Sequence, residues 1–138
     1  MDFGYLFTST AGRINRAKWW VGSIILGVIG AILGWVFMRT PLLVLVVQLV
    51  LFYPAYAVHA KRFQDRDRQG ILGIILPAWS LLGALFTTLG VWNPIEPGGL
   101  YWVYTLVMLA AAIWYLVDLG ILKGTTGQNQ YGPDPLGG

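Results

Sequence analysis

The sequence predicts an all-α, polytopic membrane protein in which four transmembrane helices form a single domain. Hydrophobic residues make up 57% of the 138 residues and charged residues only 11%, whereas soluble domains average about 25% charged residues. Four apolar runs each have the length of about 20 residues that crosses a hydrocarbon core as a helix. Backbone surrounded by lipid must satisfy its own hydrogen bonds, so these runs should be helical. The expected spans are residues 19–38, 42–60, 71–92 and 100–122.

The segment before the first span, residues 1–18, is expected to lie on the membrane surface. Its apolar side chains recur at helical spacing and are Phe3, Leu6, Phe7 and Ile14. This pattern favours a short interfacial helix on the inner leaflet over a frayed tail. Asn15 is then the expected N-cap of the first span. That span has full length and no small-residue cleavage pattern follows it, so we expect an uncleaved anchor.

Turn-forming residues separate the spans and follow the last one. A tight turn at residues 39–41 joins the first two, and Pro41 suits the first turn of the second helix. Pro and Gly in residues 93–99 indicate a turn between the third and fourth spans. The tail, residues 123–138, is also rich in Gly and Pro, which precludes a helix there.

Small residues recur along one face of the first span, at Ser23, Gly27, Gly30 and Gly34. Such a seam lets a neighbouring helix approach closely. The neighbour could belong to the same bundle or to a second copy of the chain. Packing within the bundle is favoured, because any bundle this small needs a close contact of this kind.

The distribution of basic residues predicts the orientation. Eight of the nine Lys and Arg residues lie before the first span, between the second and third spans, or in the tail, whereas Arg39 alone lies on the opposite side. Segments rich in Lys and Arg stay in the cytoplasm, so both termini are expected there. The same cations would meet anionic headgroups of the inner leaflet. A nucleic-acid interface is not expected, because the chain has no soluble domain to carry one.

The connector between the second and third spans holds the densest cluster of charges. Acidic and basic residues alternate from Lys61 to Arg68, and Asp65 is expected to pair locally with Arg62 or Arg68. Exposed pairs of this kind stabilise a protein by only about 0–1 kcal/mol. The connector is therefore either a solvated topology signal or a binding surface for headgroups or a cytoplasmic partner.

Asp118 is the one acidic residue inside a predicted span, about one turn before its cytoplasmic end. A carboxylate at that depth is costly unless it is paired or hydrated. We expect a structural ion pair with one of the cations at the same level, which are Arg13, Arg16, Lys61 and Arg62. A proton or ion relay is the alternative, but a relay needs further ionisable groups through the membrane.

Catalytic, cofactor and metal sites are not predicted. The chain has no cysteine and a single histidine, His59, so it cannot build a disulfide, an iron–sulfur cluster or a histidine metal cluster. The arginines around Asp65 would hold this carboxylate ionised, which makes it a poor general acid–base group. The protein is therefore expected not to be an enzyme.

Three motifs together resemble those of a known family. They are Gly12-Arg13-Ile14-Asn15-Arg16 with Trp19-Trp20, Lys61-Arg62 with Asp65, and Asn129 with Tyr131-Gly132-Pro133-Asp134-Pro135. In this order, over essentially the whole chain, they are similar to the domain of unknown function 805 family of small, YhaH-like bacterial inner-membrane proteins. This chain has Gln64 where family members typically have histidine. The resemblance implies four spans, no established activity and a shared inner-face constellation of Arg13, Arg16, Arg62, Asp65, Asn129, Tyr131 and Asp134.

The favoured function is that of a non-enzymatic interaction or scaffold protein of the bacterial inner membrane. Its predicted interaction network comprises Arg13, Arg16, Lys61, Arg62, Asp65, Asp118, Asn129, Tyr131 and Asp134. Its partners would be anionic lipids and another membrane protein or a second copy. A small transporter or channel component is the alternative, although the spans offer few polar residues away from their inner ends. A lipid-modifying enzyme is the least favoured, since it would need a nucleophile, a metal cluster or paired carboxylates.

Overall fold

The computed structural model describes residues 1–137; the last residue of the expected tail, Gly138, lies outside the described residues. The structure within that range is helical, with one isolated bridge between Asn129 and Gly132 in the tail. The elements are α1 (Phe3–Thr8), α2 (Arg16–Val36), α3 (Pro41–Asp65), the 3-10 helix η1 (Gly70–Ile74), α4 (Ile75–Thr88), α5 (Gly99–Tyr115) and the π-helix η2 (Leu116–Ile121).

Four helical segments are long and apolar enough to cross a membrane, which confirms the all-helical, four-span prediction. They are Arg16–Val36, Pro41–Asp65, Gly70–Thr88 and Gly99–Ile121. The second differs most from the expected bounds, because α3 continues past residue 60 through the charged residues Lys61, Arg62 and Asp65. These side chains are buried and paired, so the helix does not need to end where the apolar run ends.

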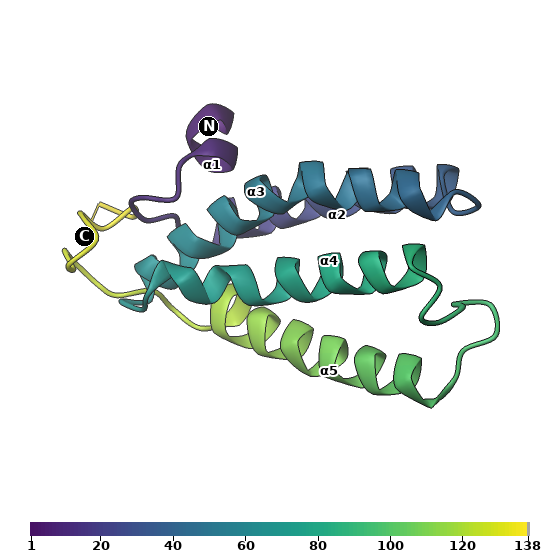
Figure 1. Ribbon diagram of the computed structural model, residues 1–138. Helices are drawn as coiled ribbons and strands as arrows, with labels where there is room; N and C mark the ends of the chain where they lie inside the picture. Colours follow the sequence, from purple (N-terminus) through teal and green to yellow (C-terminus); the bar gives the residue numbers. More distant parts are fainter. Residues whose placement is uncertain (138) are drawn as a thin grey trace.

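The helices run side by side and both chain termini lie at the same end of the bundle (Figure 1). The helix α3 is central, since it contacts α1, α2, α4 and η1. We call the end that holds the termini and the Lys61–Arg68 charges the basic end, and the opposite end the far end. The segment joining α4 to α5 closes the far end (Figure 1).

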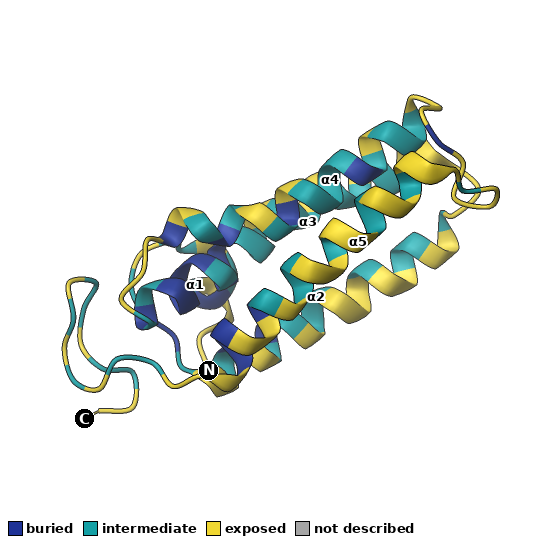
Figure 2. Cartoon of the chain, turned by 90° about the horizontal axis from the view of Figure 1, so that it is seen from below, coloured by how far each residue is buried: buried dark blue, intermediate teal, exposed yellow. Residues whose placement is uncertain are grey.

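Buried side chains concentrate at the basic end (Figure 2). The core cluster there consists of Leu6, Ile14, Trp19, Val58, Phe63, Tyr115 and Leu119. Along the rest of α2, α3 and α5, large apolar side chains are exposed, as expected for surfaces that face lipid tails. The bundle is therefore tightly packed at one end only.

The short helix α1 forms in the segment expected to be helical, but much of its apolar face packs on the bundle; its place at the membrane surface stays a prediction. Leu6 and Ile14 are buried against α2 and α3, and only Phe3 among the expected membrane contacts is well exposed. Tyr53 in α3 donates a hydrogen bond of 2.7 Å to the Thr8 carbonyl. Packing against α3 removes these side chains from water more completely than lying on a leaflet would. The segment is a folded part of the bundle.

Asn15 caps α2 as predicted, since its side-chain oxygen accepts a 2.9 Å hydrogen bond from the Lys18 amide. The small-residue seam is only partly used within the chain. A Cβ on Gly30 would lie 3.5 Å from Leu51, whereas a Cβ on Gly27 or Gly34 would meet nothing within 4 Å. The tight α2–α3 contact lies instead at Gly22, which packs against Val58.

The closest approach between helices is at Gly73 in η1, which lies directly against the backbone of α3. A Cβ at this position would lie 2.6 Å from the Ala60 nitrogen and 2.9 Å from the His59 carbonyl carbon. Backbone atoms cannot move aside as the end of a side chain can, so only glycine fits here.

We expect Gly73→Ala to destabilise the protein by about 1–3 kcal/mol, because the added methyl group overpacks a backbone contact. The measurement is the thermal unfolding midpoint of purified protein in detergent. Gly27→Ala is the matched control: it has open space, so its stability should be unchanged or higher by up to about 1 kcal/mol through helix propensity. Equal midpoints for the two variants would contradict the close packing of η1 on α3.

Candidate functional site

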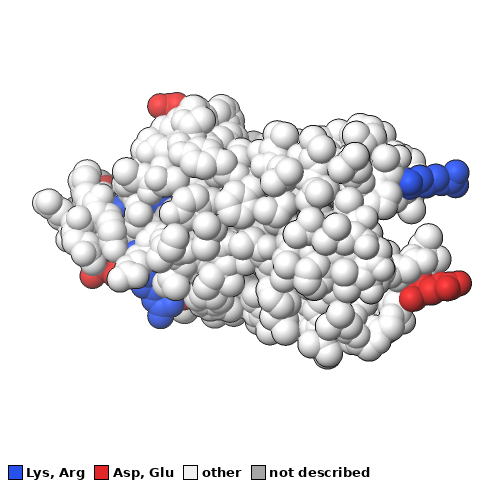
Figure 3. All heavy atoms as spheres, viewed as in Figure 1, with Lys and Arg blue, Asp and Glu red and all other residues white. Residues whose placement is uncertain are grey.

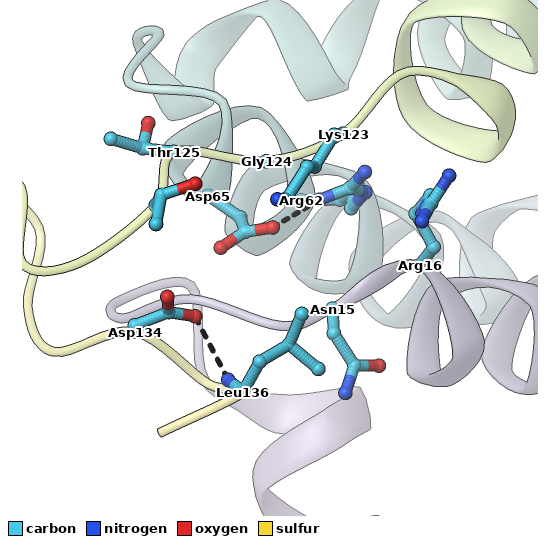
Figure 4. A pocket seen from close by; sticks show the side chains of 10 residues that line it. Asn15, Arg16, Arg62, Asp65, Lys123, Gly124, Thr125, Asp134 and Leu136 are labelled. Atoms are coloured by element: carbon cyan, nitrogen blue, oxygen red, sulfur yellow. Dashed lines mark hydrogen bonds and ion pairs between the residues drawn. The ribbon is translucent and has the colours of Figure 1, made fainter. Parts of the chain in front are cut away.

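A buried carboxylate, Asp65, organises the basic end. It is the last residue of α3 and is 3% exposed. The Nε atom of Arg13 donates to one of its oxygens at 3.0 Å, and Arg62 Nη1 donates to the other (Figure 4). Both arginines are buried as well. Two charge-assisted contacts therefore compensate a carboxylate that would be costly to bury alone.

Arg13 connects this carboxylate to the C-terminal tail. Its Nη1 atom donates to the carbonyls of Gly127 at 2.7 Å and Gly132 at 3.1 Å, and Nη2 donates to that of Thr125 at 2.6 Å. The Thr125 amide in turn donates to the Asp65 carbonyl at 2.7 Å. A chain of charge-assisted hydrogen bonds thus holds the start of the tail against α3.

The fourth span consists of α5 continued by η2, which we call the fifth helical segment, and its end is held by arginines and an indole. Arg62 donates to the carbonyls of Leu119 and Leu122, both at 2.7 Å. The remaining donors are Trp20 to Gly120 at 3.1 Å, Arg16 to Ile121 at 2.8 Å and Arg66 to Lys123 at 2.5 Å. The last carbonyls of a helix lack partners within the helix and carry partial negative charge. Arginines from α2 and from the end of α3 supply the hydrogen-bond donors that the last carbonyls of η2 lack.

Asp118 is paired, but with different cations from those predicted. Arg66 Nε donates to it at 2.8 Å, Arg68 Nη1 at 2.5 Å and Trp114 Nε1 at 3.1 Å. Arg13, Arg16, Lys61 and Arg62 do not bind it. The reason is that α3 extends to Asp65, which brings the residues after it beside η2, while the predicted cations are engaged elsewhere. Arg68 is for the same reason not the partner of Asp65.

Lys61 binds backbone carbonyls, and among residues 1–137 it binds no carboxylate. Its ammonium donates to the carbonyls of Tyr5 and Leu6 at 2.8 Å each and to that of Ser9, and it lies 4.9 Å from the centre of the Tyr5 ring. These carbonyls end the short helix α1, so the lysine caps it. Burial raises the pKa of the Tyr5 hydroxyl, opposed by a hydrogen bond from the Arg13 backbone. Tyr5 thus stays neutral beside the ammonium.

The three tail residues of the predicted network have different roles. Asn129 reaches α3, because its Nδ2 atom donates to the Gln64 carbonyl at 2.9 Å. Tyr131 contributes its backbone amide, which donates to Asn129 Oδ1 at 2.9 Å. The carboxylate of Asp134 accepts from the amides of Leu136 and Gly127, and these hydrogen bonds lower its pKa. Its contribution to tail structure is therefore present above the ordinary carboxyl pKa and is lost as the pH falls.

The structure adds functional residues that sequence reasoning missed. A Cβ on Gly124 would overlap the Asp65 carboxylate, so the tail can pass this point only as glycine. Trp19 donates to His59 Nδ1 at 3.0 Å, which ties α2 to α3. Tryptophan at the end of a membrane span commonly meets lipid headgroups. No local sequence signal distinguishes that role from an indole that binds another helix.

A cavity of about 200 Å³ remains beside Asp65, with Arg16, Arg62, Lys123 and Asp134 among its lining residues (Figure 4). The two buried carboxylates, Asp65 and Asp118, each accept from two arginines. Over residues 1–137 no group of three or more His, Asp or Glu side chains is placed to hold a metal ion. The arrangement is suited to positioning chain segments and to meeting anions at its edge.

A family model described as "Protein of unknown function (DUF805)" matches residues 7–133. The chain belongs to this family. The matched range contains every member of the predicted network except Asp134, which immediately follows it. The match therefore covers the segments that meet at the basic end, from α2 to the start of the tail.

Two relatives in Escherichia coli (strain K12) are similar to this family member. The inner membrane protein YhaI is 26% identical over 133 residues, which cover 94% of this chain and 87% of YhaI. The uncharacterized protein YiiR is 38% identical over 86 residues, which cover 61% of this chain and 54% of YiiR. The chain therefore matches about half the length of YiiR. No solved structure matches significantly.

We expect Asp65→Asn to destabilise the protein by about 3–5 kcal/mol, because it leaves two buried guanidinium groups without a counter-charge. Asp67→Asn is the matched control, since Asp67 is exposed and contacts only Gln130 in the tail through its side chain; its effect should stay within about 0.5 kcal/mol. The measurements are unfolding in detergent and protease cleavage of the tail. Similar behaviour of both variants would show that the buried carboxylate does not organise this end.

Proposed function

We propose that this protein is a non-enzymatic interaction or scaffold protein of the bacterial inner membrane, with both termini in the cytoplasm. The observation that carries the proposal is that the network of charged residues at the basic end fixes the positions of other chain segments. Its charged groups hold the tail, α1 and the end of η2 in one arrangement. An enzyme would instead need a group available to substrate with a pKa suited to its task. A fixed surface made from three distant segments is what a docking platform requires.

The surface available to partners surrounds this network. Arg68 and Lys123 are exposed at its periphery and Lys18 is partly exposed, while the buried arginines stay inside. Cations at this level favour anionic headgroups by about 1 kcal/mol each. The tail contributes polar side chains beside them. We infer that lipids orient the platform and that a membrane-protein partner or a second copy binds the tail.

A small transporter or channel component is the second candidate. The observation in its favour is a polar pair between α3 and α4, in which Ser80 donates to Gln48 at 3.2 Å. However, the buried core around Val58, Phe63 and Tyr115 lies between this pair and the basic end. A conducting path would have to cross that core, so the scaffold role is the better supported one.

The orientation can be tested directly because the chain contains no cysteine. We expect Asn93→Cys to react with a membrane-impermeant maleimide in intact spheroplasts, because it lies in the far-end connector. Gln128→Cys, in the exposed tail, should react only after the membrane is permeabilised. Labelling of the tail from outside, or of both positions from one side, would rule out the proposed orientation.

The scaffold role predicts a neighbour whose binding depends on the docked tail. A photo-crosslinker attached at Gln128→Cys should capture the same membrane protein, or a second copy, in the otherwise unchanged chain and with Asp67→Asn. Capture should fall at least about fivefold with Asp65→Asn or Gly124→Ala at matched protein levels, because each substitution displaces the tail. A fivefold fall corresponds to a loss of about 1 kcal/mol of binding free energy. Mass spectrometry identifies the neighbour. Capture that is independent of tail docking would exclude the proposal.

A further inference from the structure

A second, larger cavity of about 1350 Å³ lies at the far end of the bundle, away from the network. Its wall comes from the end of α2, from α3 and α4, from the connector and from the start of α5. Small-molecule sites have volumes of about 300–1,000 Å³. The cavity is therefore large enough for an extended ligand.

The way the helices diverge makes this cavity open sideways. The helix α2 contacts the fifth helical segment only at η2, at the basic end, and not along α5. Toward the far end α5 lies apart from the α2–α3 pair (Figure 1). Gly34 on α2 and Tyr104 on α5 both line the cavity, although these two helices do not contact each other. A space between two uncontacting membrane-spanning helices adjoins the hydrocarbon layer, so we infer that a molecule would enter from the membrane.

The interior of the cavity is apolar and aromatic with a small polar base. Trp92 lies 5.5 Å from Tyr101 and 4.9 Å from Tyr104, between ring centres, and these rings form part of the wall. Gln48 and Ser80 form the polar base. Over residues 1–137 the Gln48 Nε2 atom has no hydrogen-bond partner, since Ser80 uses only the amide oxygen, and its two N–H donors are left for a ligand.

The rim of the cavity carries one charge of each sign, Arg39 and Glu96. Both side chains are exposed, and neither forms an ion pair within the described chain. Basic and acidic groups stand on opposite sides of a notch at the far end (Figure 3). A phosphate would be attracted to the guanidinium, and an ammonium group to the carboxylate.

We propose that the far-end cavity binds one phospholipid with a zwitterionic headgroup. The acyl chains lie along the wall formed by Gly34, Val44, Ala84 and the aromatic rings. The phosphate lies at Arg39 and the headgroup amine at Glu96. The apolar wall, the sideways opening and the pair of opposite charges on the rim each point to this amphipathic occupant. The site lies at the opposite end from the proposed platform, so either proposal can fail without the other.

Native mass spectrometry of the full chain, purified in detergent with added phosphatidylethanolamine, tests the proposal. Gly34→Leu fills the cavity, while Gly27→Leu is the matched control on the same helix; both glycines have open space for a Cβ, and only Gly34 lines the cavity. One retained lipid is expected for the unchanged chain and for Gly27→Leu. Gly34→Leu should retain at least about tenfold less lipid. The leucine side chain takes the space of several acyl-chain methylene groups and removes their contacts with the wall.

The headgroup assignment has its own variants. Arg39→Gln should weaken retention of phosphatidylethanolamine about fivefold, as expected for loss of one cation near a phosphate. Glu96→Gln should weaken phosphatidylethanolamine but not phosphatidylglycerol, which has no amine. Equal lipid retention by the two glycine variants, or a dimer in place of a bound lipid, would overturn the lipid site. An unchanged lipid preference in Glu96→Gln would overturn the zwitterionic headgroup.

Discussion

The buried carboxylate of Asp65 between Arg13 and Arg62 is the constraint on which the rest of the basic end depends. Three charged groups removed from water are costly, and they persist because every guanidinium nitrogen of the two arginines donates to an acceptor. Those acceptors are the carboxylate and the carbonyls of the tail and of η2. The charges therefore do more than neutralise one another. They join three segments that are far apart in the sequence into one surface.

Helix ends explain why so many cations are buried here. The short helix α1 and the π-helix η2 both end in carbonyls that have no partner within their own helix and that pack against other segments instead of facing water. Lys61 satisfies the first set, and Arg16, Arg62 and Arg66 satisfy the second. The far end has no such network, and its helices separate around a cavity. The two ends thus differ in construction: segments are fixed by charge-assisted hydrogen bonds at one end, and a cavity lies between helices at the other.

The sequence predicted the parts of this fold that depend on local chemistry. Apolar length indicated the four spans, and Asn15 indicated the start of α2. Prediction from the sequence failed where the choice of ion-pair partner depends on the exact residue at which a helix ends. Treating Lys61 and Arg62 as loop residues led to the wrong partners for Asp118, because the burial that keeps α3 helical through Asp65 is a tertiary property. The apolar face of α1 shows a related limit, since packing on the bundle and contact with a membrane require the same apolar pattern, and only the structure shows that Leu6 and Ile14 are packed inside.

The sequence alone determined the solvent of this protein, and therefore its helices, because transfer of about 20 apolar residues into hydrocarbon outweighs any local preference. It also determined which residues gather at the basic end. Only the tertiary structure decided which cation meets which acceptor, how the tail passes Gly124 and where the bundle opens. Those outcomes depend on the register and divergence of helices, and such distances between segments are not encoded in any single run of residues.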